Sequence, residues 1–457
     1  MEEKSAGAAA ANRKAVAGYS AVVFALYIGF RMYALTKEMV GGATLYKIFM
    51  FFSWVFQGGA AYHSLDYSMG LLPRALTGQI LSFFTGGALT GRAAAIYLLA
   101  AFAITYGLFS VIVGMLIEKA VRTENYPMAM FPFLFILAPL SVWARTFFDM
   151  NFDTFMLLFA LLAFLLLLRG KNEKLLWLVP LLSCLGILAN YAFALLFFPL
   201  LFALQYYEYI QSGLKKSRLA QLIVTTVSSA ALALYTMAAP FYSERMLKLG
   251  LYKYTCEQAI AYLEGKMGHA LDLYERLFVC YSIYGKRPYG DLSALIPVKP
   301  GEWYTFQPDY GWFHPKYYLF AALLCLPVCV FSILVWRRMA KGETGFLRKS
   351  PYCLFMLAPF IIVPAFVIFA DMDRLVWSAL LTQLLLVIYA FFKNGEGGAF
   401  GRMREITKTD KLALACVAAF GLAILVPMLV FKGKDWLNPL TLEAIMVLLD
   451  KSGIIIP

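Results

Sequence analysis

Apolar residues recur along this chain in long blocks, and short polar segments separate them. A helix needs about 20 consecutive apolar residues to cross the hydrocarbon core of a bilayer. The pattern therefore predicts an all-α polytopic membrane protein with about eleven transmembrane helices, in a range of roughly nine to thirteen. The expected spans cover residues 16–35, 93–117, 127–143, 153–168, 175–189, 191–208, 219–239, 317–336, 352–369, 375–392 and 412–431. The stretch 175–207 reads either as two short helices that meet at Asn190 or as one long kinked span.

Composition agrees with this pattern. Of the 457 residues, 61% are hydrophobic and 15% are charged, and the mean hydropathy is +0.71. Soluble domains are about 45–50% apolar and about 25% charged. These values exclude a soluble enzyme, a disordered chain and a coiled coil.

The net charge of +13 is unevenly distributed among the loops. Lys and Arg gather in alternate short loops, and the loops between them hold few basic residues. Cytoplasmic loops carry such an excess, so we expect the N-terminus inside and the C-terminus outside, and no nucleic-acid partner. This orientation places two long loops outside, at about 36–92 and 240–316. We therefore divide the chain into an N-terminal membrane module (1–239), a large outer loop (240–316) and a C-terminal module (317–457).

The first outer loop holds the first candidate chemistry. Asp66 follows His63 by three residues, and Arg74 follows a Gly-Leu-Leu-Pro turn. The apolar stretch 75–84 is too short to span a bilayer, so we expect an interfacial helix there. Asp66 is thus a candidate catalytic base, and His63, Asp66 and Asp149 form a candidate divalent-cation site. Alternatively, Asp66 caps a helix or pairs with Arg74.

Two short outer turns hold further charged residues. Asp149 and Asp153 lie in one of them, where they can orient a hydroxyl or a cation, although Asp153 also suits the N-cap of the span that begins there. Asp371, Asp373 and Arg374 lie in the other. A guanidinium fork suits a lipid-linked phosphate, and the alternative is an Asp–Arg pair that closes the turn.

The large outer loop has two halves. Apolar residues recur at helical spacing from Cys256 to Tyr281, which predicts an amphipathic helix that Gly265 and Gly268 can break. A continuous helix would separate Cys256 from Cys280 by about 36 Å, so we expect no disulfide unless the helix folds back. The second half is aromatic. Its Trp303 and Trp312 suit stacking on sugar rings, or an aromatic belt at the membrane interface.

This layout resembles the GT-C class of membrane glycosyltransferases. The resemblance rests on an inside N-terminus, a long first outer loop with Asp66, a short second outer loop with Asp149 and Asp153, and a large later outer loop. The stretch from Asp66 through Gly-Leu-Leu-Pro to Arg74 is also similar to multi-pass proteins of bacterial surface-polysaccharide loci. The resemblance implies a polyprenyl-phosphate-linked sugar donor, and acidic site residues at Asp66 and at Asp149 or Asp153.

The expected function is therefore sugar transfer to a glycan or lipid acceptor at the outer face of a bacterial inner membrane. A carboxylate would take the proton of the acceptor hydroxyl, and Arg or a divalent cation such as Mg²⁺ or Mn²⁺ would stabilise the leaving phosphate. One alternative is a polymerase that joins lipid-linked repeat units. Another is a flippase or other transporter, which would place charged groups within the spans. A third is a structural or assembly subunit.

Overall fold

The computed structural model describes residues 12–25, 63–86, 91–137, 152–170, 172–271, 273–289, 294–297, 315–362 and 372–394. These residues are almost entirely helical, which confirms the predicted all-α class for this part of the chain. The exception is one antiparallel hairpin that joins β1 (Lys286–Tyr289) to β2 (Ala294–Pro297). The expected span 412–431 lies outside the described residues.

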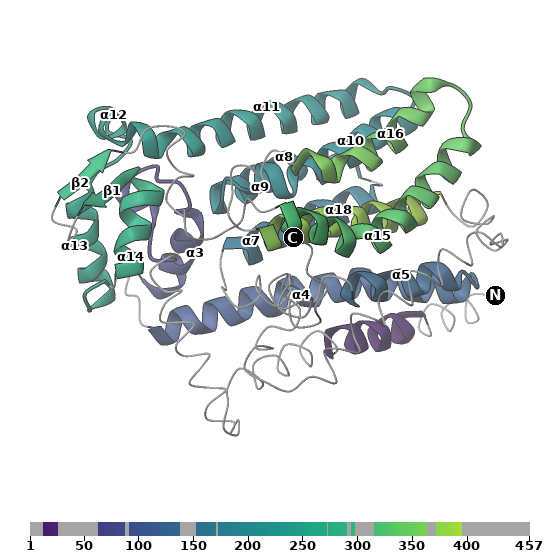
Figure 1. Cartoon of the computed structure of the whole chain (residues 1–457), viewed down its shortest axis with the longest axis horizontal. Coiled ribbons are helices and arrows are strands. Elements are labelled where there is room, and N and C mark those ends of the chain that lie inside the picture. The colour runs from purple at the N-terminus through teal and green to yellow at the C-terminus, as the bar shows by residue number, and fades with distance from the viewer. Residues whose placement is uncertain are drawn as a thin grey trace.

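Long helices run side by side and form a bundle (Figure 1). Each begins and ends close to one of the apolar blocks, because the polar segments between the blocks form the turns. They are α4 (Gly91–Arg122), α5 (Tyr126–Leu137), α7 (Phe152–Arg169), α8 (Leu178–Ala189), α10 (Phe198–Gln211), α11 (Lys216–Ala238), α15 (Pro315–Gly342), α16 (Phe346–Leu357) and α18 (Met372–Lys393). Short 3₁₀ segments precede α8 at η2 (Leu175–Trp177) and follow α16 at η6 (Ala358–Ile362). A further helix covers residues 12–25.

The helix break at Asn190 is confirmed. Asn190 has an extended backbone after α8, and the chain re-enters helix at α9 (Phe193–Leu196) before α10. The Asn190 side-chain oxygen accepts a hydrogen bond from the backbone N–H of Ala192 at 3.1 Å. Gly186 lies directly against the ring of Phe193, where a side chain would not fit. A side-chain hydrogen bond therefore stabilises the break, and the segment after it packs closely against α8.

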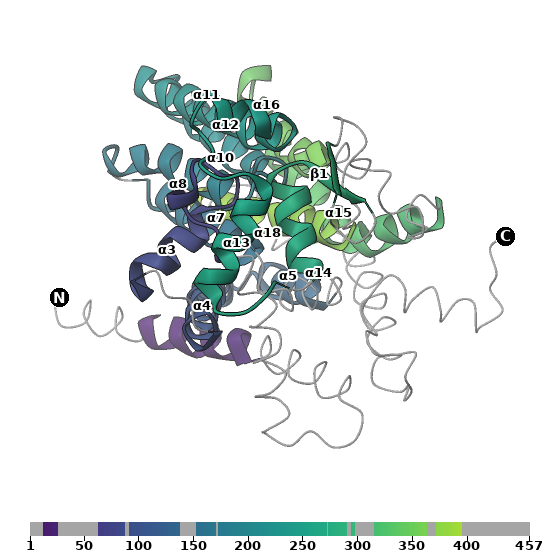
Figure 2. The same cartoon turned by 90° about the vertical axis from the view of Figure 1, so that its left-hand side faces the viewer.

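One end of the bundle carries a small folded cap, formed by residues 63–86 and the described residues from 239 to 297 (Figures 1 and 2). Its elements are η1 (Tyr67–Met69), α3 (Leu76–Thr85), η3 (Ala239–Tyr242), α12 (Ser243–Lys248), α13 (Cys256–Met267), α14 (Leu273–Leu277), the π-helix η4 (Phe278–Ile283) and the hairpin. The cap has its own apolar core, in which Leu65, Met69, Tyr252, Leu263 and Ile283 are buried. The described parts of the two predicted outer loops thus fold into one unit.

The amphipathic helix predicted from Cys256 to Tyr281 is broken at Gly268, one of the two glycines expected to break it. A capping box of Thr255 and Gln258 starts α13, and Gly268 ends it in the left-handed conformation at φ 73°. The chain then returns through α14 and η4. Gly268 adopts this conformation without the steric cost that a side chain adds, so the reversal follows from one glycine inside an otherwise helical pattern.

The opposite end of the bundle holds the short connections between α4 and α5, α7 and α8, α10 and α11, and α15 and α16 (Figure 1). These connections and the helix ends beside them are rich in basic residues. The described ones include Lys119, Arg122, Arg169, Lys174, Lys215, Lys216, Arg218, Arg337, Arg338, Lys341, Arg348, Lys349 and Lys393. In the described residues, the end that carries the cap therefore differs in fold from the end that holds the short basic connections.

Two described helical stretches, Ile96–Arg122 and Lys216–Lys248, are long and apolar enough to cross a membrane. Large apolar side chains on them also face outward: Ile104 is 59% exposed and Leu234 is 70% exposed. Both features weakly support association with a membrane. The eleven spans stay a prediction.

The contact between helix 12–25 and α4 depends on Gly114. A Cβ there would come within 2.3 Å of Ser20 Oγ and 2.9 Å of its backbone nitrogen, whereas a Cβ at Gly107 in the same helix meets nothing within 4 Å. We expect Gly114→Ala to lower stability by about 1–3 kcal/mol through overpacking. Gly107→Ala should be neutral or stabilising by up to about 1 kcal/mol. Thermal unfolding of both variants in detergent checks this, and equal midpoints would contradict the close contact.

Candidate functional site

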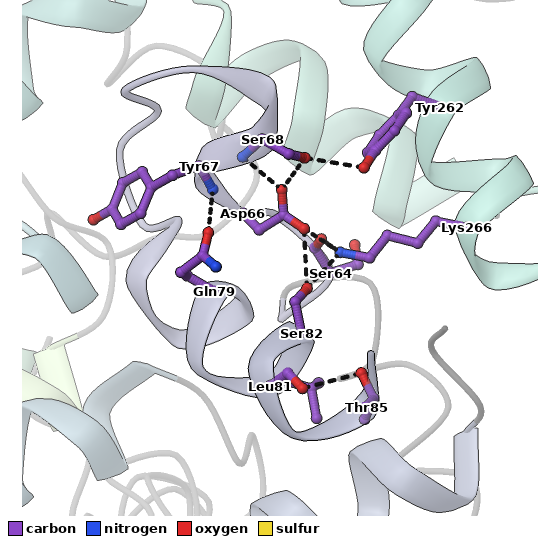
Figure 3. A network of polar contacts seen from close by, with 10 residues as sticks. All are labelled: Ser64, Asp66, Tyr67, Ser68, Gln79, Leu81, Ser82, Thr85, Tyr262 and Lys266. Atoms are coloured by element: carbon purple, nitrogen blue, oxygen red, sulfur yellow. Dashed lines mark hydrogen bonds and ion pairs between the residues drawn. The ribbon is translucent and has the colours of Figure 1, made fainter. Parts of the chain in front are cut away.

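Asp66 is the centre of a buried polar network in the cap (Figure 3). One carboxylate oxygen accepts hydrogen bonds from the backbone N–H of Ser68, at 2.9 Å, and from the Ser68 hydroxyl. The other accepts from Ser82 Oγ at 3.0 Å and from Lys266 Nζ at 2.5 Å. The contact with Ser68 caps η1, so the predicted capping role of Asp66 is confirmed.

Close backbone packing brings α3 against the segment that holds Asp66. A Cβ at Gly78 would lie 1.9 Å from the carbonyl oxygen of Leu65 and 2.6 Å from that of His63. Only glycine allows this approach, which brings the next turn of α3 beside the network. From there Ser82 reaches Asp66, and Gln79 accepts a hydrogen bond from the backbone N–H of Tyr67 at 3.1 Å.

Lys266 reaches Asp66 from α13, 200 residues later in the chain. Its ammonium also donates to the carbonyl oxygen of Ser64 and to Ser82 Oγ, both at 2.9 Å. The side chains of Lys266 and Asp66 are only 5% and 6% exposed. The predicted alternative in which Asp66 pairs with Arg74 is wrong, because α13 brings a lysine to the same carboxylate.

Our sequence reasoning missed Lys266, although its position held a signal. Cys256, Ala259 and Leu263 form the buried face of α13. Lys266 follows Leu263 by three residues, so it continues that face at helical spacing. A lysine in register with a buried face requires a buried acceptor, and this requirement could have pointed to an acidic partner.

The surroundings of Asp66 favour its ionised form. Burial disfavours the charge, but hydrogen bonds from Lys266, Ser68 and Ser82, together with the positive charge of Lys266, outweigh it, so the pKa of Asp66 is lowered. The ion pair therefore stabilises the cap fully above the ordinary Asp pKa of about 4, and this stabilisation is lost as the pH falls through the lowered pKa. In this state Asp66 is a weak base.

Arg74 contacts aromatic rings rather than Asp66. Its guanidinium carbon is 4.9 Å from the ring centroid of Tyr191, at the α8–α9 break, and 5.6 Å from that of Phe278 in η4. Its backbone is left-handed, with φ 66°. This conformation is uncommon for residues other than glycine and clusters at functional sites. Arg74 thus connects the first loop, the helix break and the large loop.

His63 is a core residue in this structure. It is fully buried, its Nδ1 lies 2.9 Å from Thr77 Oγ1, and its ring packs 5.5 Å from that of Phe155. Asp66 is already neutralised by Lys266, so the surroundings of these two residues do not suit a divalent cation. The described residues contain no group of three or more His, Cys, Asp or Glu side chains placed to hold a metal. Asp149, the third predicted ligand, lies outside the described residues.

The remaining candidates are placed only in part. Asp153 is buried, with 3% exposure, in the first turn of α7, where the helix dipole favours a carboxylate. Asp373 and Arg374 were predicted in a turn, but their backbone belongs to the start of α18, which begins at Met372. The predicted site residues Asp149, Asp371, Trp303 and Trp312 lie outside the described residues.

A second, partly buried charged cluster lies at the basic end of the bundle, and our sequence analysis did not single it out. Glu208 of α10 lies 2.9 Å from Lys393 Nζ and 3.8 Å from an Arg218 nitrogen, and it accepts a hydrogen bond from Tyr389. Arg218 also donates to the carbonyl oxygen of Gly170 at 3.3 Å. The cluster ties the ends of α7, α10, α11 and α18 together, which gives it a structural role.

No protein-family model, curated protein or solved structure matches this chain. The resemblance to GT-C enzymes therefore stays a resemblance.

The buried pair predicts a coupled stability effect. Lys266→Met leaves a buried carboxylate without its cation, so we expect a loss of about 3–5 kcal/mol at neutral pH. The loss should shrink on acidification, because burial raises the pKa of Asp66 once Lys266 is removed, and the carboxyl of the variant then becomes protonated. It should also shrink when Asp66→Asn is added, so the double variant should lose less than the sum of the single losses. The free energies of unfolding of the three variants at several pH values measure these losses.

Lys248→Met, at an exposed site on α12, is the control. Strictly additive losses in the double variant would contradict the pairing.

Proposed function

We propose that this chain is a membrane glycosyltransferase that takes a sugar from a polyprenyl-phosphate-linked donor and transfers it to an acceptor hydroxyl at the cap. The observation that carries the proposal is the buried Asp66–Lys266 ion pair. In this pair a potential base and a potential phosphate ligand neutralise each other. Such a pair, held where the first loop meets the large loop, suits a reaction whose substrate carries both a phosphate and a reacting sugar.

The donor phosphate would compete with Asp66 for the ammonium of Lys266. A phosphate oxygen is a strong acceptor for an ammonium and for a guanidinium, and Arg74, whose guanidinium contacts two aromatic rings, is another cation of the cap. When Lys266 turns to the phosphate, Asp66 loses the positive charge that lowers its pKa. Burial then raises that pKa, so Asp66 becomes a better base when the donor is bound.

The transfer itself needs no nucleotide. Asp66 accepts the proton of the acceptor hydroxyl, the acceptor oxygen forms a bond to the anomeric carbon, and the bond from that carbon to the phosphate oxygen breaks. The leaving group is the polyprenyl phosphate, whose developing charge Lys266 and Arg74 stabilise. A single displacement inverts the anomeric centre.

The proposed setting is a bacterial inner membrane crossed by about eleven helices. The cap faces outward and the basic end of the bundle faces the cytoplasm, as the positive-inside rule predicts. The apolar side chains exposed on α4 and α11 support contact with lipid. A polyprenyl chain would then lie in the bilayer with its phosphate at the level of the cap.

Turnover of purified protein with polyprenyl-phosphate-linked sugars tests the proposal. We expect Asp66→Asn to lower turnover about 10²–10⁴-fold, because the amide cannot take the proton, while donor affinity stays close to wild type or rises as Lys266 is released. Glu244→Gln, an exposed carboxylate of α12, is the matched control and should leave turnover unchanged. Turnover of Asp66→Asn within about threefold of wild type would remove Asp66 from the mechanism.

The same assay separates the other functions. Products that grow by whole repeat units would indicate a polymerase. Movement of an intact lipid-linked sugar across a vesicle, without cleavage of the sugar–phosphate bond, would indicate a flippase. Both results would contradict the proposed single-sugar transfer.

Labelling of exposed positions in intact cells tests the orientation. Lys248 lies on the cap and Lys341 near the end of α15, and both are exposed. We expect a membrane-impermeant maleimide to label a cysteine at position 248 and to label one at position 341 only after permeabilisation. The reverse pattern would invert the topology and place the proposed site in the cytoplasm.

A further inference from the structure

Two cysteines of the cap face each other across its core. Cys256 begins α13 and Cys280 lies in η4, 24 residues later. Their sulfur atoms are 3.1 Å apart, and each residue is only 1% exposed. The expectation that helix geometry keeps these residues apart is therefore wrong, because Gly268 reverses the chain between them.

Hydrogen bonds fix the backbone on both sides of the cysteine pair. The Thr255 capping box fixes the start of α13, so Cys256 occupies the first helical position. The Tyr252 hydroxyl donates to the carbonyl oxygen of Ile283 at 3.2 Å, which holds the end of η4 to the segment before α13. The two sulfurs therefore meet because the surrounding contacts bring α13 and η4 together, without a covalent bond to do so.

We propose that Cys256 and Cys280 form a disulfide bond in the native protein, which crosslinks α13 to η4. The inference rests on the proposed outward orientation of the cap, because disulfides persist on the oxidising side of a membrane and are rare in the cytosol. It does not depend on sugar transfer.

The chemistry requires a thiol–disulfide oxidoreductase as oxidant. One cysteine thiolate attacks the oxidoreductase disulfide, forms a mixed disulfide and displaces one oxidoreductase thiolate. The second cysteine thiolate then attacks the mixed disulfide, so the Cys256–Cys280 bond forms and the oxidoreductase leaves as a dithiol. Two protons pass from the cysteines to solvent and to the leaving thiolates, and two electrons reduce the oxidant. Because both sulfurs are buried in the folded cap, the exchange takes place before the cap closes.

The hydrogen bond from Cys256 lowers the pKa of the Cys280 thiol, which makes Cys280 the more readily ionised member of the pair. The hydrogen bond and burial raise the pKa of Cys256.

The crosslink would join the two parts of the large loop that serve the candidate site. Lys266 lies on α13, which Cys256 begins, and Phe278, whose ring contacts Arg74, lies two residues before Cys280. The disulfide would therefore hold the partner of Asp66 and the aromatic support of Arg74 at a fixed separation. Both cations proposed to bind the donor phosphate depend on that separation.

Mass spectrometry of the full chain, isolated from membranes with free thiols alkylated at lysis under denaturing conditions, tests the proposal. We expect the peptides that contain Cys256 and Cys280 to be linked, each without its thiol hydrogen, and to take up alkylating reagent only after reduction. Cys184, a partly exposed residue of α8, should be alkylated without reduction. Alkylation of both Cys256 and Cys280 before reduction, or a link from either of them to another cysteine, would overturn the proposal.

A stability measurement gives an independent readout. Reductant should lower the thermal midpoint of the wild-type protein by about 3–7 °C, as expected for opening a loop of this length in a large chain. The midpoint of the Cys256→Ala/Cys280→Ala variant should not respond to reductant, while the Cys184→Ala control should respond as wild type does. If this double variant does not fold, the alkylation pattern of the wild-type protein still decides. A wild-type midpoint that reductant leaves unchanged would contradict a disulfide that crosslinks α13 to η4.

Discussion

A buried ammonium–carboxylate contact between two distant loops is the constraint on which the cap depends. Removing a carboxylate and an ammonium from water costs several kcal/mol for each ion, so the pair is tolerated only with further hydrogen bonds. Asp66 receives four hydrogen bonds from three residues, and Lys266 donates to three acceptors. Ser82 takes part on both sides, because it donates to Asp66 and accepts from Lys266. The neighbouring structure serves this arrangement: Gly78 lets α3 approach, and the capping box fixes the start of α13.

The same contact limits the chemistry that the site can perform. A carboxylate with all its hydrogen bonds made and a lowered pKa is a poor base, and an ammonium paired with it is a poor phosphate ligand. Loss of the pair costs about 3–5 kcal/mol when nothing replaces it. A phosphate-bearing substrate can supply the replacement, since it gives Lys266 another anion. We therefore propose that the ion pair is the resting state and that a suitable donor separates it. Asp66 would then become a stronger base only after the donor has bound.

Much of the helical architecture could be predicted from the sequence, because each apolar block is a local signal that one helix satisfies. The helix break at Asn190 and the N-cap of η1 at Asp66 could also be predicted from local sequence, because each short polar side chain hydrogen-bonds to the backbone beside it. The Asp66–Lys266 pair could not be predicted in this way, because its partners are 200 residues apart. The Cys256–Cys280 contact was missed for another reason. Helical periodicity continues through Gly268, and only the left-handed backbone of that glycine turns the chain back.

Infrared titration of the Asp66 carboxyl is the most direct test of a pair that a donor phosphate opens. The carbonyl stretch of the protonated carboxyl is assigned to Asp66 by its loss in Asp66→Asn. The intensity of this band is then followed over pH, with and without polyprenyl phosphate, to give the titration midpoint of Asp66. We expect a midpoint below the ordinary Asp value of about 4 in the free protein and an upward shift when polyprenyl phosphate binds. A midpoint that stays low with polyprenyl phosphate bound would show that Lys266 does not leave Asp66, and would contradict Asp66 as the base of the proposed transfer.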